Sequence, residues 1–194
     1  MNVRAIDKKR LVIVGATGMV GGYALRYALE HPAIGCATSI GRRELGISHP
    51  KMHEVVHQDF ANCSVLAPAL TDQDAAIFCL GTYTGTVPDA QLRAITVDYT
   101  TESARVLRSS RPDAAFSFLS GSGADPTGRS RMAFARYKGE AEKVIRADDL
   151  ARAMVDVVVG GMGVAPRMVF ENRDIRALIQ PLDPQRGAAA KGRK

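Results

Sequence analysis

The 194-residue sequence has no tryptophan, and aromatic residues make up only 6% of it. No run of about 18 apolar residues is present, which is the length a membrane span needs, and the N-terminal ten residues are mostly polar and charged. We therefore expect neither a membrane span nor a signal peptide. Cysteine is scarce too, because Cys36, Cys63 and Cys79 are an odd number without a C-x-x-C pair. This usage argues against disulfides and predicts a cytoplasmic protein.

The net charge of +6 is concentrated at the two ends of the chain, in residues 8–10 and 191–194. Basic ends of this kind are commonly solvated tails, and neither end resembles a known nucleic-acid reader. A nucleic-acid function is therefore not favoured. All four histidines precede residue 58, so no Asp-then-His order follows Gly121-Ser122-Gly123, which excludes a serine hydrolase.

Apolar runs alternate with helical patterns along the chain, as in βαβ units around a parallel sheet. The pattern predicts an α/β protein with a Rossmann-type doubly wound sheet in a single NAD(P)-binding domain, residues 1–180, followed by a disordered basic tail, 181–194. Strands are expected at 10–14, 36–40, 54–57, 74–80, 114–119 and 169–172, and helices at 19–30, 88–110, 130–144 and 148–159.

The glycines Gly15, Gly18 and Gly21 follow the first strand at the spacing of a dinucleotide-binding loop. Gly15 permits the tight exit from the strand, Gly18 lets backbone approach a pyrophosphate, and Gly21 lets the helix pack closely on the sheet. The helix that follows offers free N–H groups and a positive dipole end. The cofactor-binding candidates in this loop are Gly15, Thr17, Gly18, Met19 and Val20.

The second strand ends with Gly41-Arg42-Arg43, where an NAD-binding protein would carry an acidic residue for the ribose 2′-hydroxyl. Two guanidinium groups at this position suit a 2′-phosphate, because arginine forms bidentate contacts with phosphate. The sequence thus favours NADP(H) over NAD(H). The alternative is that Arg42 and Arg43 are simply solvated.

Two further turns are expected at the same edge of the sheet. Asp59 and Phe60 follow the third strand, where they could hold the edge and the face of the adenine. Leu80, Gly81 and Thr82 end the fourth strand, where a glycine lets a cofactor pass close to backbone. The alternative for each is an ordinary turn, which is less favoured.

Together with Ser120–Asp125 and Lys138–Glu142, these segments resemble the atypical short-chain dehydrogenase/reductases, in particular the group containing the Tat-interacting oxidoreductase-like and NmrA-like proteins. The resemblance spans most of residues 10–145. It implies a cofactor across the carboxyl edge of the sheet, with a serine, a tyrosine and a lysine at the reaction centre. In such enzymes the tyrosine donates the proton and the lysine holds the ribose.

Carried over by residue, the lysine is Lys138 and the serine is Ser120 or Ser122, of which Ser122 is the catalytic candidate and Ser120 a cofactor contact. The tyrosine of the Tyr-x-x-x-Lys pattern is replaced by Phe134, which has no proton to donate. Tyr137 is the remaining candidate, but adjacent residues of a helix point about 100° apart. Either Tyr137 or a water would have to replace the tyrosine.

The resemblance also implies a sixth strand and a substrate-covering segment after the lysine helix, which this sequence does not contain. Either the chain has lost this segment or the sequence omits it. We expect an NADP(H)-dependent oxidoreductase that acts on a small carbonyl-type substrate of unknown identity. The alternative is a non-catalytic NADP(H)-binding regulator or scaffold. The helices at 88–110 and 130–144 could pair in a homodimer.

Two further motifs do not indicate a functional site. His53-Glu54-Val55-Val56-His57 matches H-E-x-x-H, but two valines and the position of the third strand favour a β conformation. The two histidines would then lie about 13 Å apart, too far for one zinc ion. Cys79 could be a redox thiol, but a buried residue at a strand end is the simpler interpretation.

Overall fold

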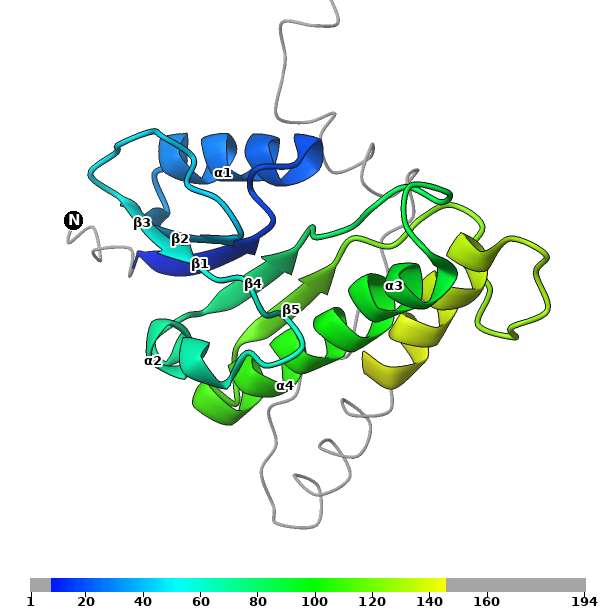
Figure 1. Cartoon of the computed structure of the whole chain (residues 1–194). Coiled ribbons are helices and arrows are strands. Elements are labelled where there is room, and N and C mark those ends of the chain that lie inside the picture. The colour runs from blue at the N-terminus through cyan, green and yellow to red at the C-terminus, as the bar shows by residue number, and fades with distance from the viewer. Residues whose placement is uncertain (1–7, 146–194) are drawn as a thin grey trace, which may run out of the picture. The chain divides into compact units, whose positions relative to one another are not determined.

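Five parallel strands form a single sheet in the order β3-β2-β1-β4-β5. The computed structural model describes residues 8–145 of the chain (Figure 1). The strands are β1 Lys9–Val14, β2 Ile34–Gly41, β3 Met52–Val56, β4 Ala75–Phe78 and β5 Ala115–Phe118. The chain runs outward from β1 to β3 and then returns to β4 on the other side of β1. This order confirms the predicted doubly wound topology.

The strands end in register at one edge of the sheet. Val14 of β1 is paired with Ile40 of β2 on one side and with Phe78 of β4 on the other. Phe78 is in turn paired with Phe118 of β5. Because all five strands are parallel, the loops that follow them gather at this carboxyl edge, on both sides of the point where the strand order reverses. That point is where doubly wound sheets bind their ligands.

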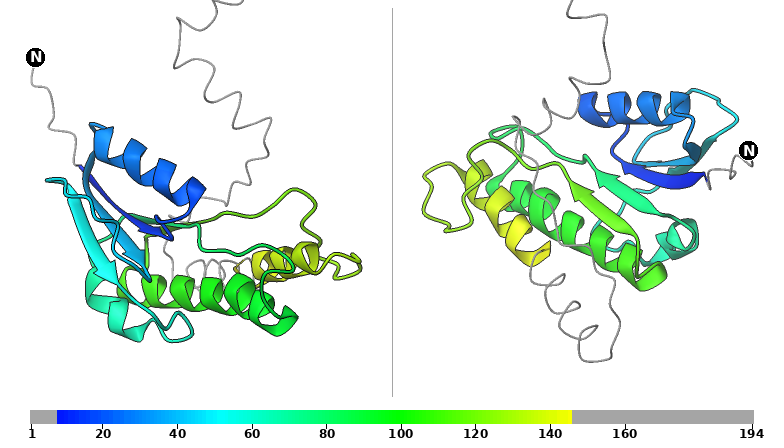
Figure 2. Two further views of the ribbon diagram at one scale, coloured as in Figure 1. Left: turned by 45° about the horizontal axis from the view of Figure 1, so that its top comes forward. Right: turned by 180° about the vertical axis from the view of Figure 1, so that it is seen from behind.

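Helices cover both faces of the sheet (Figure 2). One face carries α1, Met19–Glu30. The other carries α2 at Ala67–Leu70, preceded by a 3₁₀ turn at Ser64–Leu66, and then α3 at Asp89–Arg93, a π-helical turn at Ala94–Asp98 and α4 at Tyr99–Ser110. A further helix at residues 133–145 follows β5 and lies on the side of α3 and α4.

Each face has its own hydrophobic core. Leu25 and Leu29 of α1 pack on Ile13 and Ala37 on the first face. On the second face Phe78 and Leu107 belong to a larger cluster, and the fully buried members of that cluster are Val12, Ile40, Phe60, Cys63 and Phe78. The alternation of side chains along β1 explains this division, because Ile13 faces one core while Val12 and Val14 face the other. Because the sheet is buried on both faces, the positions of its strands are fixed. The positions of the loops at its carboxyl edge are fixed with them.

The predicted elements agree with this architecture, with small differences in their bounds. The helix predicted at 19–30 has those bounds, and the helix predicted at 88–110 is continuous from Asp89 to Ser110 except for the unforeseen π-helical turn. The short helical segment at 64–70 was not predicted. The elements expected at 148–159 and 169–172, the tail at 181–194 and the question of the missing segment lie outside the described residues. Within the described part, no helix is long and apolar enough to cross a membrane.

Candidate functional site

The glycine loop between β1 and α1 is packed so tightly that three of its positions admit no side chain without movement. Gly15 has φ of +88°, and a β-carbon there would lie 2.9 Å from the backbone nitrogen of Leu80. A β-carbon on Gly21 would lie 2.3 Å from the carbonyl oxygen of Gly15, and one on Gly18 would lie 3.3 Å from the same oxygen. The first turn of α1 is thus held against the end of β1, as a dinucleotide-binding loop requires.

The N-terminus of α1 faces outward at this loop. Gly18 is the N-cap residue, with φ of −84° and ψ of 165°, and no side chain caps the helix. Thr17, Met19 and Val20 are exposed beside it. The first N–H groups of a helix have no partner within the helix. Without a capping side chain, these donors are available to an anion such as a pyrophosphate.

The exit of β4 lies directly beside the glycine loop. The N–H of Cys79 donates to the carbonyl of Val14 at 2.9 Å, which brings Leu80 against Gly15. Gly81 is exposed, and a β-carbon there would have no atom within 4 Å. The hydroxyl of Thr82 is hydrogen-bonded to that of Thr86 at 3.0 Å. The structure therefore brings together the two turns that flank the point where the strand order reverses.

Arg42 and Arg43 extend from the end of β2 on the other side of the glycine loop. Both side chains are exposed, and within residues 8–145 neither guanidinium has a hydrogen bond or ion pair. The backbone carbonyl of Arg42 accepts a hydrogen bond of 2.6 Å from the side-chain amide of Gln58, which ties the exits of β2 and β3 together. The two cations are therefore held by a fixed backbone while their charged groups remain available.

In the loop after β3, the prediction that Phe60 holds the face of an adenine is wrong. Phe60 is 0% exposed and belongs to the hydrophobic core, where its ring lies 6.1 Å from that of Tyr99. Its ring cannot stack on an adenine, because it is buried in the core beneath α4, where removal of its apolar surface from water stabilises the fold. Asp59 remains exposed, and its Oδ1 accepts the N–H of Ala61 at 3.1 Å.

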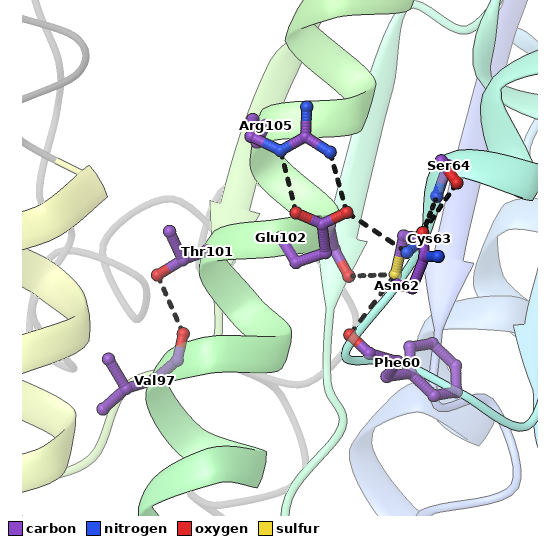
Figure 3. Close-up of polar contacts among 9 residues, drawn as sticks. Phe60, Asn62, Cys63, Ser64, Val97, Thr101, Glu102 and Arg105 are labelled. Carbon is purple, nitrogen blue, oxygen red and sulfur yellow. Dashed lines mark hydrogen bonds and ion pairs between the residues drawn. The ribbon is translucent and has the colours of Figure 1, made fainter.

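Glu102 of α4 anchors this loop, a role that sequence reasoning missed (Figure 3). Its Oε1 accepts the N–H of Cys63 at 3.2 Å, and both of its oxygens accept hydrogen bonds of 2.8 Å from Arg105. The Arg105 guanidinium and the Cys63 N–H lower the pKa of Glu102. The sequence signals only the Glu102–Arg105 pair, because the partner Cys63 is 39 residues away.

Lys138 lies on the 133–145 helix and reaches the end of β5. Its side chain is buried, with 9% of the residue exposed, and its Nζ donates a hydrogen bond of 2.7 Å to the carbonyl of Leu119. The same atom lies 4.4 Å from the centre of the Phe118 ring. Burial lowers the pKa of Lys138 to about 8, against the opposing effects of Cys79 and Glu142. Burial likewise raises the pKa of the Cys79 thiol.

The two serines expected near Lys138 have different surroundings. The hydroxyl of Ser120 donates to the carboxylate of Glu142, four residues beyond Lys138. Ser122 is exposed two residues further along the loop. Of the two, Ser122 has the hydroxyl that is open to a ligand.

Phe134, four residues before Lys138, packs on the β5 exit loop. A β-carbon on Gly121 would lie 2.3 Å from the para carbon of the Phe134 ring. The ring carries no hydroxyl at that carbon and therefore brings no donor to the loop. Within the described residues the phenyl edge is in contact with backbone.

Tyr137 faces away from the lysine. Its hydroxyl donates to Asp89 at the start of α3, and this hydrogen bond raises the pKa of the Tyr137 phenol. Arg93 of α3 forms a second link to the same helix through Glu140. Tyr137 and Lys138 thus have different partners, as the 100° between adjacent helical residues requires.

The H-E-x-x-H segment has the β conformation expected for it. His53 and Glu54 lie in β3, and Glu54 accepts the N–H of Leu45 at 2.7 Å. His57 lies just beyond the strand, with its Nε2 2.7 Å from the carbonyl of Asp59. In the part of the chain that the structure describes, no group of three or more His, Cys, Asp or Glu residues could hold a metal ion.

The sheet order and the glycine loop define the class of fold, a doubly wound Rossmann-type sheet. Among curated proteins, the chain is similar to Protein HTATIP2 of Rattus norvegicus, with 29% identity over 139 residues. This finding confirms the resemblance to the Tat-interacting oxidoreductase-like proteins. The match covers 71% of this chain and 56% of the relative, so the chain spans about half the length of the curated protein. No family model matches the chain.

Solved structures agree on the fold. A mutant of uronate dehydrogenase from Agrobacterium tumefaciens, complexed with NAD, has a TM-score of 0.59 at 19% identity over 77% of this chain and 57% of that one. The Bordetella bronchiseptica enzyme WbmG, in complex with NAD and UDP, has a TM-score of 0.60 at 12% identity, covering 75% and 52%. The putative carbonyl reductase Sniffer of Caenorhabditis elegans has 0.61 at 12%, covering 74% and 80%.

Proposed function

We propose that this chain binds NADP(H) in preference to NAD(H) and forms the cofactor-binding part of an oxidoreductase that acts on a small carbonyl-type compound. One observation carries the proposal: a glycine loop too tight for side chains leaves the N-terminus of α1 open beside two unpaired guanidinium groups. When bound, the nicotinamide would supply or accept the hydride. The chain's own residues would bind and orient the dinucleotide.

The residues divide into three contacts along a dinucleotide. The N–H groups of Met19 and Val20 would hold the pyrophosphate, since the helix dipole favours negative charge there. The N–H of Gly18 already donates to the carbonyl of Gly15 at 3.0 Å, so Gly18 would contribute by letting the backbone come close to the ligand. Arg42 and Arg43 would hold a 2′-phosphate. Asp59, at the exit of β3, would contact the adenine.

The remaining residues lie on the nicotinamide side. The open backbone at Gly81 and Thr82 would let the dinucleotide pass, and Lys138, next to the carbonyl of Leu119, would hold the nicotinamide ribose. Ser122 would orient the substrate carbonyl. Because Tyr137 is engaged with Asp89, a water is the better candidate for the proton donor.

The test is a titration with NADPH and with NADH, followed by the fluorescence of the reduced nicotinamide. We expect NADPH to bind at least tenfold more tightly. Arg42→Ala and Arg43→Ala should each weaken NADPH binding by about 10- to 100-fold, the range for hydrogen bonds to charged groups, and leave NADH binding unchanged. Arg26→Ala is the matched control, because Arg26 lies over the rings of Tyr23 and Tyr27 on α1. Equal binding of the two cofactors would overturn the NADP(H) preference, and binding of neither would overturn the whole proposal.

A second function, a non-catalytic NADP(H)-binding regulator, is favoured by Phe134. Its ring packs against Gly121 and has no proton to donate. Phe134→Tyr distinguishes the two functions, with NADPH oxidation measured on simple aldehydes and ketones. Turnover in the parent or the variant supports a reductase site. Tight NADPH binding without turnover in either protein supports the regulator.

A further inference from the structure

Glu142 is part of the candidate site, although nothing in the glycine or lysine motifs assigns it a role. Its carboxylate accepts the hydroxyl of Ser120. Lys138 and Glu142 are four residues apart on one helix and therefore share a face. Lys138 donates to the carbonyl of Leu119, the residue next to Ser120. Two consecutive residues of the β5 exit are thus each bonded to one member of the Lys138–Glu142 pair.

The groups around the Lys138 ammonium come from three elements. The Cys79 thiol faces it from the end of β4, the Leu119 carbonyl and the Phe118 ring face it from β5, and Glu142 faces it from its own helix. Burial raises the pKa of Cys79, so this thiol is neutral at neutral pH. Glu142 is the member of the set that supplies a full negative charge there.

Burial alone disfavours the ammonium form of a lysine. A lysine holds a ribose hydroxyl or attracts a phosphate best as a cation with three donors. Burial lowers the pKa of Lys138 to about 8, and the Glu142 carboxylate acts against this effect. Removal of the Glu142 charge should therefore lower the pKa of Lys138 further.

We infer that Glu142 is a positioning residue for Lys138: its hydrogen bond with Ser120 fixes the helix against the β5 exit, and its carboxylate places a negative charge on the helix face that carries the lysine, where a dinucleotide would bind. This inference rests on the proposed function. It also assigns Ser120 to the support of the site, as the partner of Glu142, and leaves Ser122 as the serine that faces a substrate.

The test uses Glu142→Gln in the full chain, because glutamine can still accept the Ser120 hydroxyl but carries no charge. Glu140→Gln is the matched control, since Glu140 lies on the same helix but is paired with Arg93. The first readout is the titration of Lys138, followed by the ¹³Cε shift in lysine-labelled protein and assigned with Lys138→Met. We expect the midpoint to fall by about one pH unit in Glu142→Gln and to stay unchanged in Glu140→Gln.

The second readout is the pH dependence of NADPH binding. A midpoint lowered by about one pH unit predicts affinity about fivefold weaker at pH 8 in Glu142→Gln, with little change at pH 6. Glu142→Asp, which keeps the charge, should restore most of the binding. An unchanged Lys138 midpoint in Glu142→Gln would overturn the inference.

The experiment distinguishes failure of the proposed function from failure of the inference about Glu142. If the parent protein binds no NADPH, the proposed function fails, while the Lys138 titration still decides whether Glu142 acts on the lysine. If Glu142→Gln does not fold, Glu142→Met replaces it, because methionine has a similar volume and also removes the charge. An unchanged midpoint in Glu142→Met would then overturn the inference.

Discussion

Gly21 allows the glycine loop to close, because its α-carbon lies against the end of β1. A β-carbon there would be 2.3 Å from the carbonyl oxygen of Gly15 and 2.8 Å from its carbonyl carbon. Both neighbours are backbone atoms, which cannot rotate away as a side chain could. The requirement for glycine therefore arises from the contact between the helix and the strand.

Gly21→Ala should lower the free energy of unfolding by about 3 kcal/mol or more, because overpacking against backbone is poorly relieved. Gly22→Ala is the control on the same turn of the helix. Its β-carbon would lie 3.2 Å from the carbonyl oxygen of Ala16, and the gain in helix propensity of about 1 kcal/mol offsets that tight contact. Urea unfolding of both variants measures the difference. Equal stability of the two would contradict this account of the loop.

The tight packing of the glycine loop could be predicted from the sequence, because the spacing of its glycines is a local signal. Phe60 could not, since its burial depends on Tyr99 and the core beneath α4, about 40 residues further along the chain. The Ser120–Glu142 contact was equally hidden, because serine and glutamate are common residues whose pairing is decided by tertiary structure. Residues whose roles depend on distant partners were thus the ones that sequence analysis missed or misassigned.

At the scale of elements, the β5 exit loop and the 133–145 helix are fitted to each other through glycines. Gly121 lies under the ring of Phe134, and a β-carbon on Gly139 would lie 2.1 Å from the carbonyl carbon of Asp125. The N–H of Asp125 also donates to the carbonyl of Ala135 at 2.8 Å. The 133–145 helix, which carries Lys138, is therefore packed closely in a single position against the loop that carries Ser122.

Gly121→Ala should cost about 1–3 kcal/mol of stability, because the new methyl group would collide with the Phe134 ring. The cost should fall below about 1 kcal/mol in a Phe134→Ala background, where the ring is absent, so a double-mutant cycle should give a clear coupling energy. Gly81→Ala is the control, because its β-carbon would meet open space. Additive effects of Gly121→Ala and Phe134→Ala would show that the two residues do not press on each other.

The Glu102 anchor of the β3 exit should make part of the stability depend on acid. The Arg105 guanidinium and then the Cys63 N–H hold the pKa of Glu102 below its ordinary value of 4.5. A carboxyl group with a lowered pKa in the folded state contributes stability above its unfolded pKa and loses it as the pH falls through the folded pKa. We therefore expect the free energy of unfolding of Glu102→Gln to decrease less steeply than that of the parent as the pH falls below about 4.5. Urea unfolding between pH 3 and 6 measures this dependence. Glu44→Gln, which changes an exposed residue, should keep the slope of the parent.

The elements could be predicted where the sequence has a clear hydrophobic periodicity, or a glycine or proline at the end of an element. Met19–Glu30 has the bounds expected between Gly18 and His31-Pro32, and the five strands have the expected order along the chain. The π-helical turn at Ala94–Asp98 was not foreseen, because a π turn differs from an α turn in one hydrogen bond and leaves the apolar pattern intact. The helical segment at 64–70 was too short for a period to emerge.

At the scale of the whole molecule, the described residues form five strands of a doubly wound sheet, on both sides of the point where the strand order reverses. The carboxyl edge carries the glycine loop, Arg42 and Arg43 on one side of the point where the strand order reverses, and Gly81 and Lys138 on the other. Under the proposed function, specificity for a carbonyl compound would depend on what faces Ser122 beyond this edge. The proposed titrations therefore test cofactor binding separately from substrate choice.

The stability of the molecule should also rise with pH on the alkaline side, because of Lys138. Burial lowers the pKa of this lysine from 10.5 to about 8. Between these two values the unfolded chain binds more protons than the folded protein, so the free energy of unfolding increases with pH. The full gain is at most about 3 kcal/mol, the free energy that corresponds to the change in pKa. The thiols of Cys63, which is buried, and of Cys79, which is half-buried, act in the opposite direction above about pH 9, because desolvation raises their pKa.

A comparison with Lys138→Met isolates this contribution, since both proteins keep the cysteines. Unfolding by urea without cofactor, at intervals from pH 7 to 10, should give a difference in stability that favours the variant at pH 7 and shrinks as the parent lysine loses its proton. Lys143→Met removes an exposed charge from the same helix and should track the parent throughout. A constant difference between Lys138→Met and the parent over this range would mean that Lys138 titrates like an exposed lysine. The inference about Glu142 would then lose its basis as well.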